Sequence, residues 1–168
     1  FSEDVNNRLS PRLILTMPPR HGKSQLTSKT FPSWHLGKYP THEIMACSYS
    51  GSLSMGFSRI NRELMRDPAY QVLFDTRLHT DSQGAEAWMT SEGGGYTSAG
   101  IGGAITGKGA HALIIDDPVK NREDAESETS RENAWGWYTS TAYTRLAPGG
   151  GVLVILTRWH DDDLAGRL

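Results

Sequence analysis

Near its amino terminus the chain reads Arg12-Leu13-Ile14-Leu15-Thr16-Met17-Pro18-Pro19-Arg20-His21-Gly22-Lys23-Ser24. The first five residues have the apolar content of a strand, and a Gly-Lys-Ser tripeptide follows where a strand would turn into a helix. Gly22 would let backbone N–H groups close on phosphate oxygens, Lys23 can reach a phosphate, and the Ser24 hydroxyl can ligate Mg²⁺. The pattern therefore predicts a strand, a phosphate-binding loop and a helix, the opening unit of an α/β fold.

The loop departs from the pattern G-x-x-x-x-G-K-[ST] of P-loop nucleotide-binding proteins. Met17 stands where the first glycine is expected, and Pro18 and Pro19 stiffen the turn. Because a Gly-Lys-Ser tripeptide can also merely cap a helix, the loop alone leaves both interpretations open. If it binds ATP, the residues in contact with the nucleotide are predicted to be Pro19, Arg20, His21, Gly22, Lys23, Ser24 and Gln25.

A second motif favours the nucleotide interpretation. The apolar run 112–115 has the character of a buried parallel strand and ends in Asp116-Asp117. Asp116 would hold Mg²⁺ through water, and Asp117 could orient the water that attacks the γ-phosphate, as in the Walker B motif. Asp-Asp-Pro is also ordinary turn chemistry, but its place downstream of Gly-Lys-Ser favours the catalytic role.

Length and composition indicate one α/β domain. The chain has 168 residues, 37% of them hydrophobic and 21% charged, enough to bury a substantial core. It begins with Phe1 rather than Met, so we expect an excerpt of a longer protein. The lone Cys47 excludes a disulfide framework and a cysteine-based zinc site within these residues, and suits a reducing compartment.

Charge and hydropathy restrict the partners. No stretch is apolar enough to cross a membrane. A net charge of −2 and a pI near 6.3 argue against a protein that coats nucleic acid, although Lys120 and Arg122 remain possible local contacts.

Strand-like and helix-like segments alternate as in βαβ units, which predicts a mainly parallel sheet with helices on both faces. The expected elements are a helix over 23–36, a strand over 43–48, a helix over 53–65, a hairpin with strands at 88–90 and 96–98 that makes one sheet edge mixed, a long helix over 121–146 and a strand over 152–156, set off by a glycine-rich break at 148–151. Helical spacing assigns two sets of residues to the core rather than to a ligand. These are Phe57, Ile60, Leu64 and Met65 in one helix, and Ala134, Trp137, Tyr138, Thr141, Ala142 and Arg145, with Trp135 beside them, in the other.

Three further features bear on chemistry. Thr157 leaves the carboxyl end of a central strand, where it could sense the γ-phosphate or the attacking water. Lys108 stands between two glycines of the loop 100–109, and its local sequence favours a solvent-facing lysine. The run 160–163, His-Asp-Asp-Asp, could ligate the metal of a nuclease, but helix capping is the simpler interpretation.

Taken in order, Pro-Pro-Arg-His-Gly-Lys-Ser (18–24), Ile-Ile-Asp-Asp-Pro-Val-Lys (114–120) and Thr-Arg-Trp-His-Asp-Asp-Asp-Leu-Ala-Gly-Arg-Leu (157–168) resemble the ATPase domain of tailed-phage terminase large subunits over nearly the whole chain. The resemblance implies a RecA-like P-loop ATPase of the ASCE type that uses ATP and Mg²⁺ to pump double-stranded DNA. It further implies a homo-oligomeric ring at the portal protein of a procapsid in the host cytoplasm, with a small terminase subunit as partner. A C-terminal nuclease domain and most of an upstream adenine-binding segment are expected to lie outside residues 1–168, which would then form the ATPase domain.

The same resemblance assigns roles by position. Lys23 and Ser24 match the phosphate and Mg²⁺ residues, Asp116 the Walker B aspartate, Asp117 the catalytic carboxylate and Thr157 the coupling motif. Two departures follow. Asp117 is shorter than the usual Glu, and Lys108 stands where relatives commonly carry an arginine that reaches a neighbour's site, although lysine lacks the bidentate fork. Arg20 is the other candidate cation.

Two rival functions share these motifs. A DNA helicase or remodelling ATPase would have both Walker sequences but would separate strands. A nonenzymatic assembly module, with a loop that binds no nucleotide, would show no Mg²⁺-dependent turnover.

Overall fold

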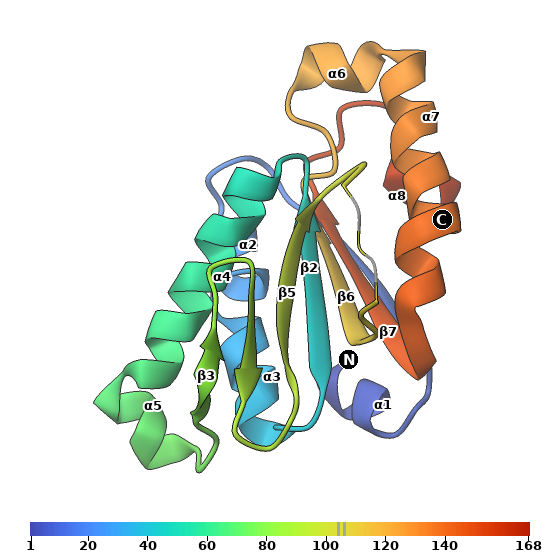
Figure 1. The fold of residues 1–168 in the computed structure, drawn as a ribbon. Coiled ribbons are helices and arrows are strands. Elements are labelled where there is room, and N and C mark those ends of the chain that lie inside the picture. Colours follow the sequence, from blue (N-terminus) through green and yellow to red (C-terminus); the bar gives the residue numbers. More distant parts are fainter. Residues whose placement is uncertain (104, 106) are drawn as a thin grey trace.

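One seven-stranded sheet organises the chain in the computed structural model, which describes residues 1–103, 105 and 107–168 (Figure 1). The strands are β1 (Arg12–Thr16), β2 (Glu43–Ser48), β3 (Leu78–Gln83), β4 (Ala87–Thr90), β5 (Gly95–Gly100), β6 (Ala110–Asp116) and β7 (Leu146–Leu156). Their order across the sheet is β1-β7-β6-β2-β5-β4-β3. The two strands predicted from the motifs, β1 and β6, both pair with β7. The loops that follow β1 and β6 therefore lie near one another.

Five neighbouring strands of the sheet are parallel, and the edge opposite β1 is antiparallel. β1, β7, β6, β2 and β5 pair in parallel, whereas β5, β4 and β3 pair antiparallel. The predicted hairpin and the predicted mixed edge are thus confirmed, and β3 is an added strand that the sequence analysis did not anticipate. Because parallel strands share a direction, the loops after β1, β6 and β7 emerge at the same edge of the sheet.

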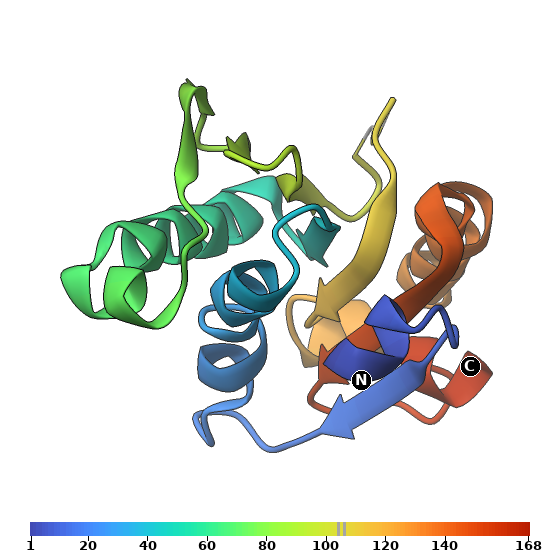
Figure 2. The ribbon, with the colours of Figure 1, turned by 90° about the horizontal axis from the view of Figure 1, so that it is seen from below.

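Helices cover both faces of the sheet. They are α1 (Ser2–Asn6), α2 (Lys23–Thr27), α3 (Phe31–Lys38), α4 (Gly51–Arg66), α5 (Pro68–Leu73), α6 (Arg122–Glu126), α7 (Glu128–Trp137) and α8 (Leu164–Arg167), with a π-helical turn η1 (Tyr138–Ala142) and a 3₁₀ turn η2 (Tyr143–Arg145) after α7. Figure 1 shows α2, α3 and α4 on one side of the sheet and α7 on the other, and Figure 2 shows the same layers from below. α6 lies beyond the carboxyl ends of the strands.

Alternating residues of the central strands build two cores. In β2, Met45 and Cys47 belong to the core under α7 and η1, whereas Ile44 and Ala46 belong to the core under α3 and α4. Successive strand side chains point to opposite faces, so a continuous apolar run is what a strand covered on both sides requires. The predicted α/β class with helices on both faces is therefore confirmed.

The prediction of one helix over 23–36 is wrong in one respect, because this segment forms two helices. α2 ends at Thr27, and α3 begins at Phe31. Pro32 has no N–H, and its ring would clash with the carbonyl of Ser28 in an uninterrupted helix. The break places Ser28 in the joint between the two helices.

The predicted helix over 53–65 exists as α4, but its buried face differs from the prediction. Phe57 and Met65 are buried, whereas Ile60 is 38% exposed and Leu64 is only partly buried. The face toward the sheet instead carries three fully buried small polar residues, Ser54, Ser58 and Asn61. Hydrophobic spacing could not reveal this, because hydrogen bonds to other elements satisfy these side chains.

The long helix predicted over 121–146 is also divided. α6 ends at Glu126, Ser127 has an extended backbone and caps α7, and the last turns are π-helical and 3₁₀. The core assignment holds for Ala134, Trp137, Tyr138 and Ala142, which are buried, whereas Thr141 and Arg145 are only partly buried.

Two strands differ from expectation. β7 begins at Leu146 and runs through the glycine-rich segment that was predicted to break the chain, with an irregular register beside β6. β1 is an edge strand, so Leu13 and Ile14 are 37% and 39% exposed. The predicted loop 100–109 connects β5 to β6, and its residues 104 and 106 lie outside the described part of the chain.

Candidate active site

The loop after β1 exposes a series of backbone N–H groups. Arg20 and Gly22 have left-handed backbones, with φ of +64° and +85°. Glycine adopts that conformation without strain, whereas Arg20 does so at a cost. Within the described residues, no protein group accepts a hydrogen bond from the backbone N–H groups of residues 20–25. Consecutive N–H groups that lack a protein acceptor can bind an anion.

Lys23 is the centre of the site. Although it is a lysine at the start of a helix, only 8% of it is exposed. Its Nζ donates to Thr157 Oγ1 at 2.6 Å and lies 2.9 Å from Asp117 Oδ2. Three segments that are far apart in the sequence, after β1, β6 and β7, thus meet at one ammonium group.

Asp117 faces Lys23 through an unusual backbone conformation. Its φ is +46°, a left-handed value that only a few non-glycine residues adopt. The turn is held by its N–H, which donates to Ile155 O at 2.8 Å, and by its carbonyl, which accepts from Tyr49 N at 3.2 Å. Its carboxylate is engaged on both oxygens, because Oδ1 accepts from Thr157 N at 3.1 Å and Oδ2 pairs with Lys23. Strain of this kind is typical of functional positions.

Thr157 connects all three loops. Besides accepting from Lys23, its hydroxyl donates to Met17 O at 3.1 Å, in the segment that follows β1. The side chain is therefore held between the segment after β1 and Asp117, at the carboxyl end of β7.

Asp116 is buried next to this group and takes two hydroxyl hydrogen bonds. Ser24 Oγ donates to its Oδ1 at 3.1 Å, and Ser28 Oγ donates to its Oδ2 at 2.5 Å. Burial raises the pKa of the Asp116 carboxyl above its usual value, and the two serine hydrogen bonds oppose that rise. Ser28 is a site residue that the sequence analysis missed. It lies one helical turn after Ser24, and that spacing is the signal that could have found it.

Ser24 and Asp116 suit a magnesium ion that keeps most of its waters better than a metal ion bound entirely by protein side chains. Mg²⁺ prefers oxygen ligands and keeps several waters, so it needs only one or two protein groups, which Ser24 and Asp116 can supply. In the described residues, no group of three or more His, Cys, Asp or Glu side chains is arranged to hold a metal ion.

The predicted residues that remain outside the cluster are exposed. Arg20 and Gln25 have solvent-facing side chains, and the ring of His21 is exposed, its Nδ1 lying 2.9 Å from Pro19 O. Lys108 is also exposed, and it precedes the amino end of β6, whereas the cluster lies at the carboxyl end. Seven strand residues span roughly 20 Å, so Lys108 does not reach the Lys23 site of its own chain.

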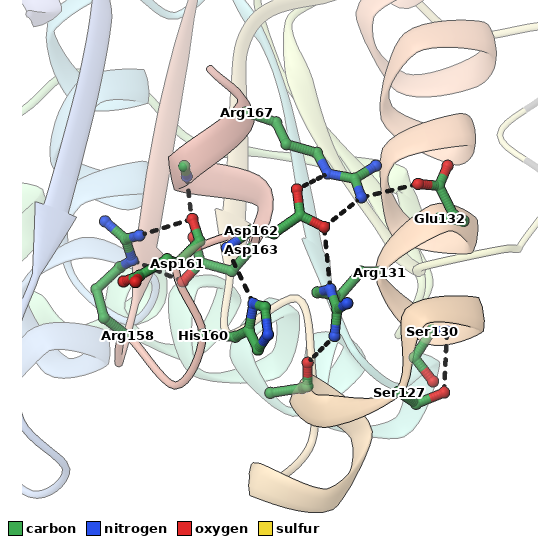
Figure 3. A network of polar contacts seen from close by, with 12 residues as sticks. Ser127, Ser130, Arg131, Glu132, Arg158, His160, Asp161, Asp162, Asp163 and Arg167 are labelled. Carbon is green, nitrogen blue, oxygen red and sulfur yellow. Dashed lines mark hydrogen bonds and ion pairs between the residues drawn. The ribbon is translucent and has the colours of Figure 1, made fainter.

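The acidic run after β7 has structural partners (Figure 3). Asp163 caps α8 by accepting from Gly166 N at 2.9 Å, as predicted, and its other oxygen accepts from Arg158 Nε at 2.7 Å. Asp162 accepts from Arg167 Nε at 2.7 Å and Arg131 Nε at 3.1 Å, and these hydrogen bonds lower the pKa of its carboxyl. The loop that carries Thr157 is thereby tied to α7 and α8.

The chain resembles known proteins in its sequence and in its fold. Residues 14–167 match the family described as "Terminase large subunit, T4likevirus-type, N-terminal". Among solved structures, the large terminase of bacteriophage HK97 is similar in fold, with a TM-score of 0.63 at 15% identity over 96% of this chain. The chain spans 33% of that protein's length. No curated protein matches the chain.

Nothing in the described residues forms a helix long and apolar enough to cross a bilayer. The resemblance drawn from the three motifs is confirmed by the family match, which covers all three of them except Leu168. This chain belongs to the family of terminase large subunit N-terminal domains.

Proposed function

We propose that this domain binds and hydrolyses Mg·ATP and that hydrolysis drives double-stranded viral DNA into a procapsid. The observation that carries the ATPase proposal is the convergence of Lys23, Asp117 and Thr157 beside Asp116 and Ser24. Membership of the terminase large subunit family supports the packaging role. The RecA-like ASCE assignment rests on the same convergence of the two Walker motifs.

In the proposed phosphoryl transfer, each group of side chains has a separate role. The N–H groups of the loop 20–25 and the Lys23 ammonium would bind the phosphates. Ser24 and Asp116 would hold Mg²⁺, which when bound neutralises charge on the phosphates. Asp117 would orient the attacking water, and Thr157 would sense whether Lys23 has moved.

In the proposed cycle, Lys23 leaves Asp117 when it binds a phosphate. In the structure the Lys23 ammonium pairs with Asp117 Oδ2 and occupies one of the positions from which that oxygen could accept a hydrogen bond. When Lys23 turns to the phosphate, Oδ2 is released, while Thr157 N continues to hold Oδ1. Phosphate binding and activation of the carboxylate are thereby coupled through one lysine.

The wider assembly belongs to the same proposal. We expect the full-length protein to act as a ring on the portal protein, with a small terminase subunit, in the cytoplasm of the host cell. Residues 1–168 are proposed to have no nuclease activity, because Asp162 and Asp163 are already committed to arginines and a helix cap.

The test is ATP turnover by the full-length protein and its Lys23→Ala variant. Wild type should hydrolyse ATP only with Mg²⁺, and Lys23→Ala should lose turnover because no other buried cation lies beside Asp117 in the described residues. Near-wild-type turnover in the variant would refute the phosphate-loop assignment. A wild-type protein that neither binds nor hydrolyses ATP would favour a nonenzymatic assembly module. A wild-type protein that uses ATP to separate the strands of duplex DNA would favour a helicase.

A further inference from the structure

Asn61 of α4 hydrogen-bonds to two other helices, α2 and α3. It is fully buried, and its amide oxygen and both amide hydrogens have hydrogen-bond partners. Its Oδ1 accepts from Ser33 N at 3.0 Å, and its Nδ2 donates to Ser28 O at 2.7 Å and to Phe57 O at 2.9 Å. A side chain with both amide hydrogens used in this way is fixed in orientation.

The two long-range partners of Asn61 are groups that a helix cannot satisfy by itself. Ser28 O lies at the end of α2, and Ser33 N lies in the first turn of α3. Terminal carbonyls and N–H groups lack intrahelical partners, and burying them unpaired is unfavourable. Asn61 therefore fixes the joint between α2 and α3 where Ser28 stands.

Ser28 is fully buried and its hydroxyl donates to Asp116 Oδ2. We propose that Ser28 is a positioning residue that orients the Asp116 carboxylate for the metal, and that Asn61 acts through Ser28 by holding this joint. The inference rests on the proposed function. There the Ser24 hydroxyl is assigned to Mg²⁺, which leaves Ser28 as the hydroxyl donor that keeps Asp116 oriented.

Ser28→Ala tests the first half of the inference. Full-length protein is titrated with Mg²⁺ in the presence of a fluorescent, nonhydrolysable ATP analogue, and the affinity for the same analogue is also measured in EDTA. Loss of an outer-shell partner costs about 10-fold or more in metal affinity. We expect the Mg²⁺ concentration at half-saturation to rise by about 10-fold, with metal-free affinity changed by less than about twofold.

Ser54→Ala is the matched control. Ser54 is equally buried, and its hydroxyl donates to Ala46 O at 2.7 Å, away from the carboxylates. Both variants should lose similar stability in chemical denaturation, but only Ser28→Ala should shift the Mg²⁺ titration. An equal shift in both variants, or no shift in Ser28→Ala, would overturn the positioning role.

Asn61→Asp tests the second half. It preserves the shape and the acceptor for Ser33 N but removes both amide donors; Asn61→Ala, which adds no charge, replaces it should the carboxylate prevent folding. The Mg²⁺ titration should shift in the same direction as for Ser28→Ala, and the double variant should be no worse than Ser28→Ala alone. Additive shifts would show that Asn61 does not act through Ser28.

Failure of the proposed function gives a different result. A wild-type protein that binds no nucleotide with or without Mg²⁺ would refute both the proposed function and this inference. A wild-type protein with Mg²⁺-dependent binding that Ser28→Ala leaves unchanged would refute the inference alone.

Discussion

Asp117 is the residue whose geometry most constrains the chemistry. Its left-handed backbone turns the carboxylate back toward Lys23, and both carboxylate oxygens have partners. If Asp117 is the catalytic carboxylate of the proposed ATPase, the main chain must bring its short side chain toward the attacking water. The positive φ of Asp117 is a means of doing so.

We predict that Asp117→Asn retains Mg·ATP binding but loses most turnover. The amide keeps an acceptor for Thr157 N and frees Lys23 from an ion pair, whereas it cannot attract a proton from water as a carboxylate does. General-base effects of this kind amount to about 10²–10⁴-fold in rate. Nucleotide binding by fluorescence and single-turnover hydrolysis would measure the two properties separately.

Asp116→Asn is the appropriate comparison for that variant. It should weaken the Mg²⁺ dependence of binding, which Asp117→Asn should not. If a folded Asp117→Asn protein loses binding together with turnover, the metal role belongs to Asp117 instead.

Histidines join helix α3 to the elements around it. His35 Nδ1 is 2.7 Å from Ser2 Oγ of α1, and His35 Nε2 is 3.0 Å from His42 Nδ1. The His42 ring stacks on His111 of β6 with centroids 4.5 Å apart. Burial, and then the neighbouring His42, lower the pKa of His35 to about 3, and burial lowers that of His42 to about 4.

These pKa values predict acid sensitivity with a definite sign. The folded pKa of His35 lies below its unfolded value of about 6.5, so the unfolded chain binds the proton more tightly. The unfolding free energy should therefore fall as the pH falls below about 6.5, by about 2 kcal/mol from His35 alone at pH 4.5. Urea denaturation of the wild type and His35→Gln should show a shallower acid slope in the variant. His21→Gln, at an exposed histidine outside this cluster, is the matched control.

The division of the predicted long helix supplies another prediction. Ser127 Oγ accepts from Ser130 N at 3.3 Å and caps α7. Ser127→Ala should lower the unfolding free energy by about 1 kcal/mol, the usual effect of losing a cap. Ser127→Asp, which keeps an acceptor and adds a charge suited to the helix dipole, should retain the stability. Equal losses in both variants would show that the loss does not come from the missing cap acceptor.

Across the sheet, Lys108 lies at the end opposite the cluster around Lys23. It precedes the amino end of β6, while Lys23 and Asp117 lie beyond the carboxyl ends of the strands. If Lys108 is the proposed catalytic cation, it must therefore act on the site of another subunit, whereas Arg20 belongs to the loop of the site itself.

We predict that Lys108→Ala binds ATP but fails to hydrolyse it in the assembled full-length motor. A cation supplied in trans is worth about 10³–10⁵ in rate. Mixing Lys108→Ala with Lys23→Ala subunits should restore some turnover, because an intact Lys23 site then meets an intact Lys108. If the two co-assemble and the mixture stays inactive while Lys108→Ala alone is also inactive, the trans role is wrong. Loss of turnover in Arg20→Ala would then identify the loop cation.

Several elements could be predicted from the sequence because their signals are local. The bounds of β2 and the place of β6 follow from uninterrupted apolar runs, which a strand covered on both faces requires. The identity of Lys23, Ser24, Asp116 and Asp117 as a candidate site followed from two short motifs, whose residue types are dictated by phosphate and metal chemistry. The structure brings these four residues together with Thr157.

Other features could not be predicted, because they depend on contacts between segments distant in the sequence. The joint between α2 and α3 is stabilised by Asn61 from α4, and the exposure of Ile60 follows from a buried polar face that hydrogen-bonds to other elements. The pairing of Lys23 with Asp117 needs a main-chain turn at Asp117 that hydrogen-bonds to β7 and to Tyr49.

The fold class, the motif residues and the family could thus be recognised from the sequence, since strand periodicity and short motifs are properties of short stretches. The pairing of Lys23 with Asp117 and Thr157, the sharing of Asp116 by Ser24 and Ser28, and the place of Lys108 at the opposite end of the sheet emerge only from the folded chain. Buried polar groups find their hydrogen-bond and ion-pair partners in distant segments, and the separation of such partners along the chain carries no periodic signal.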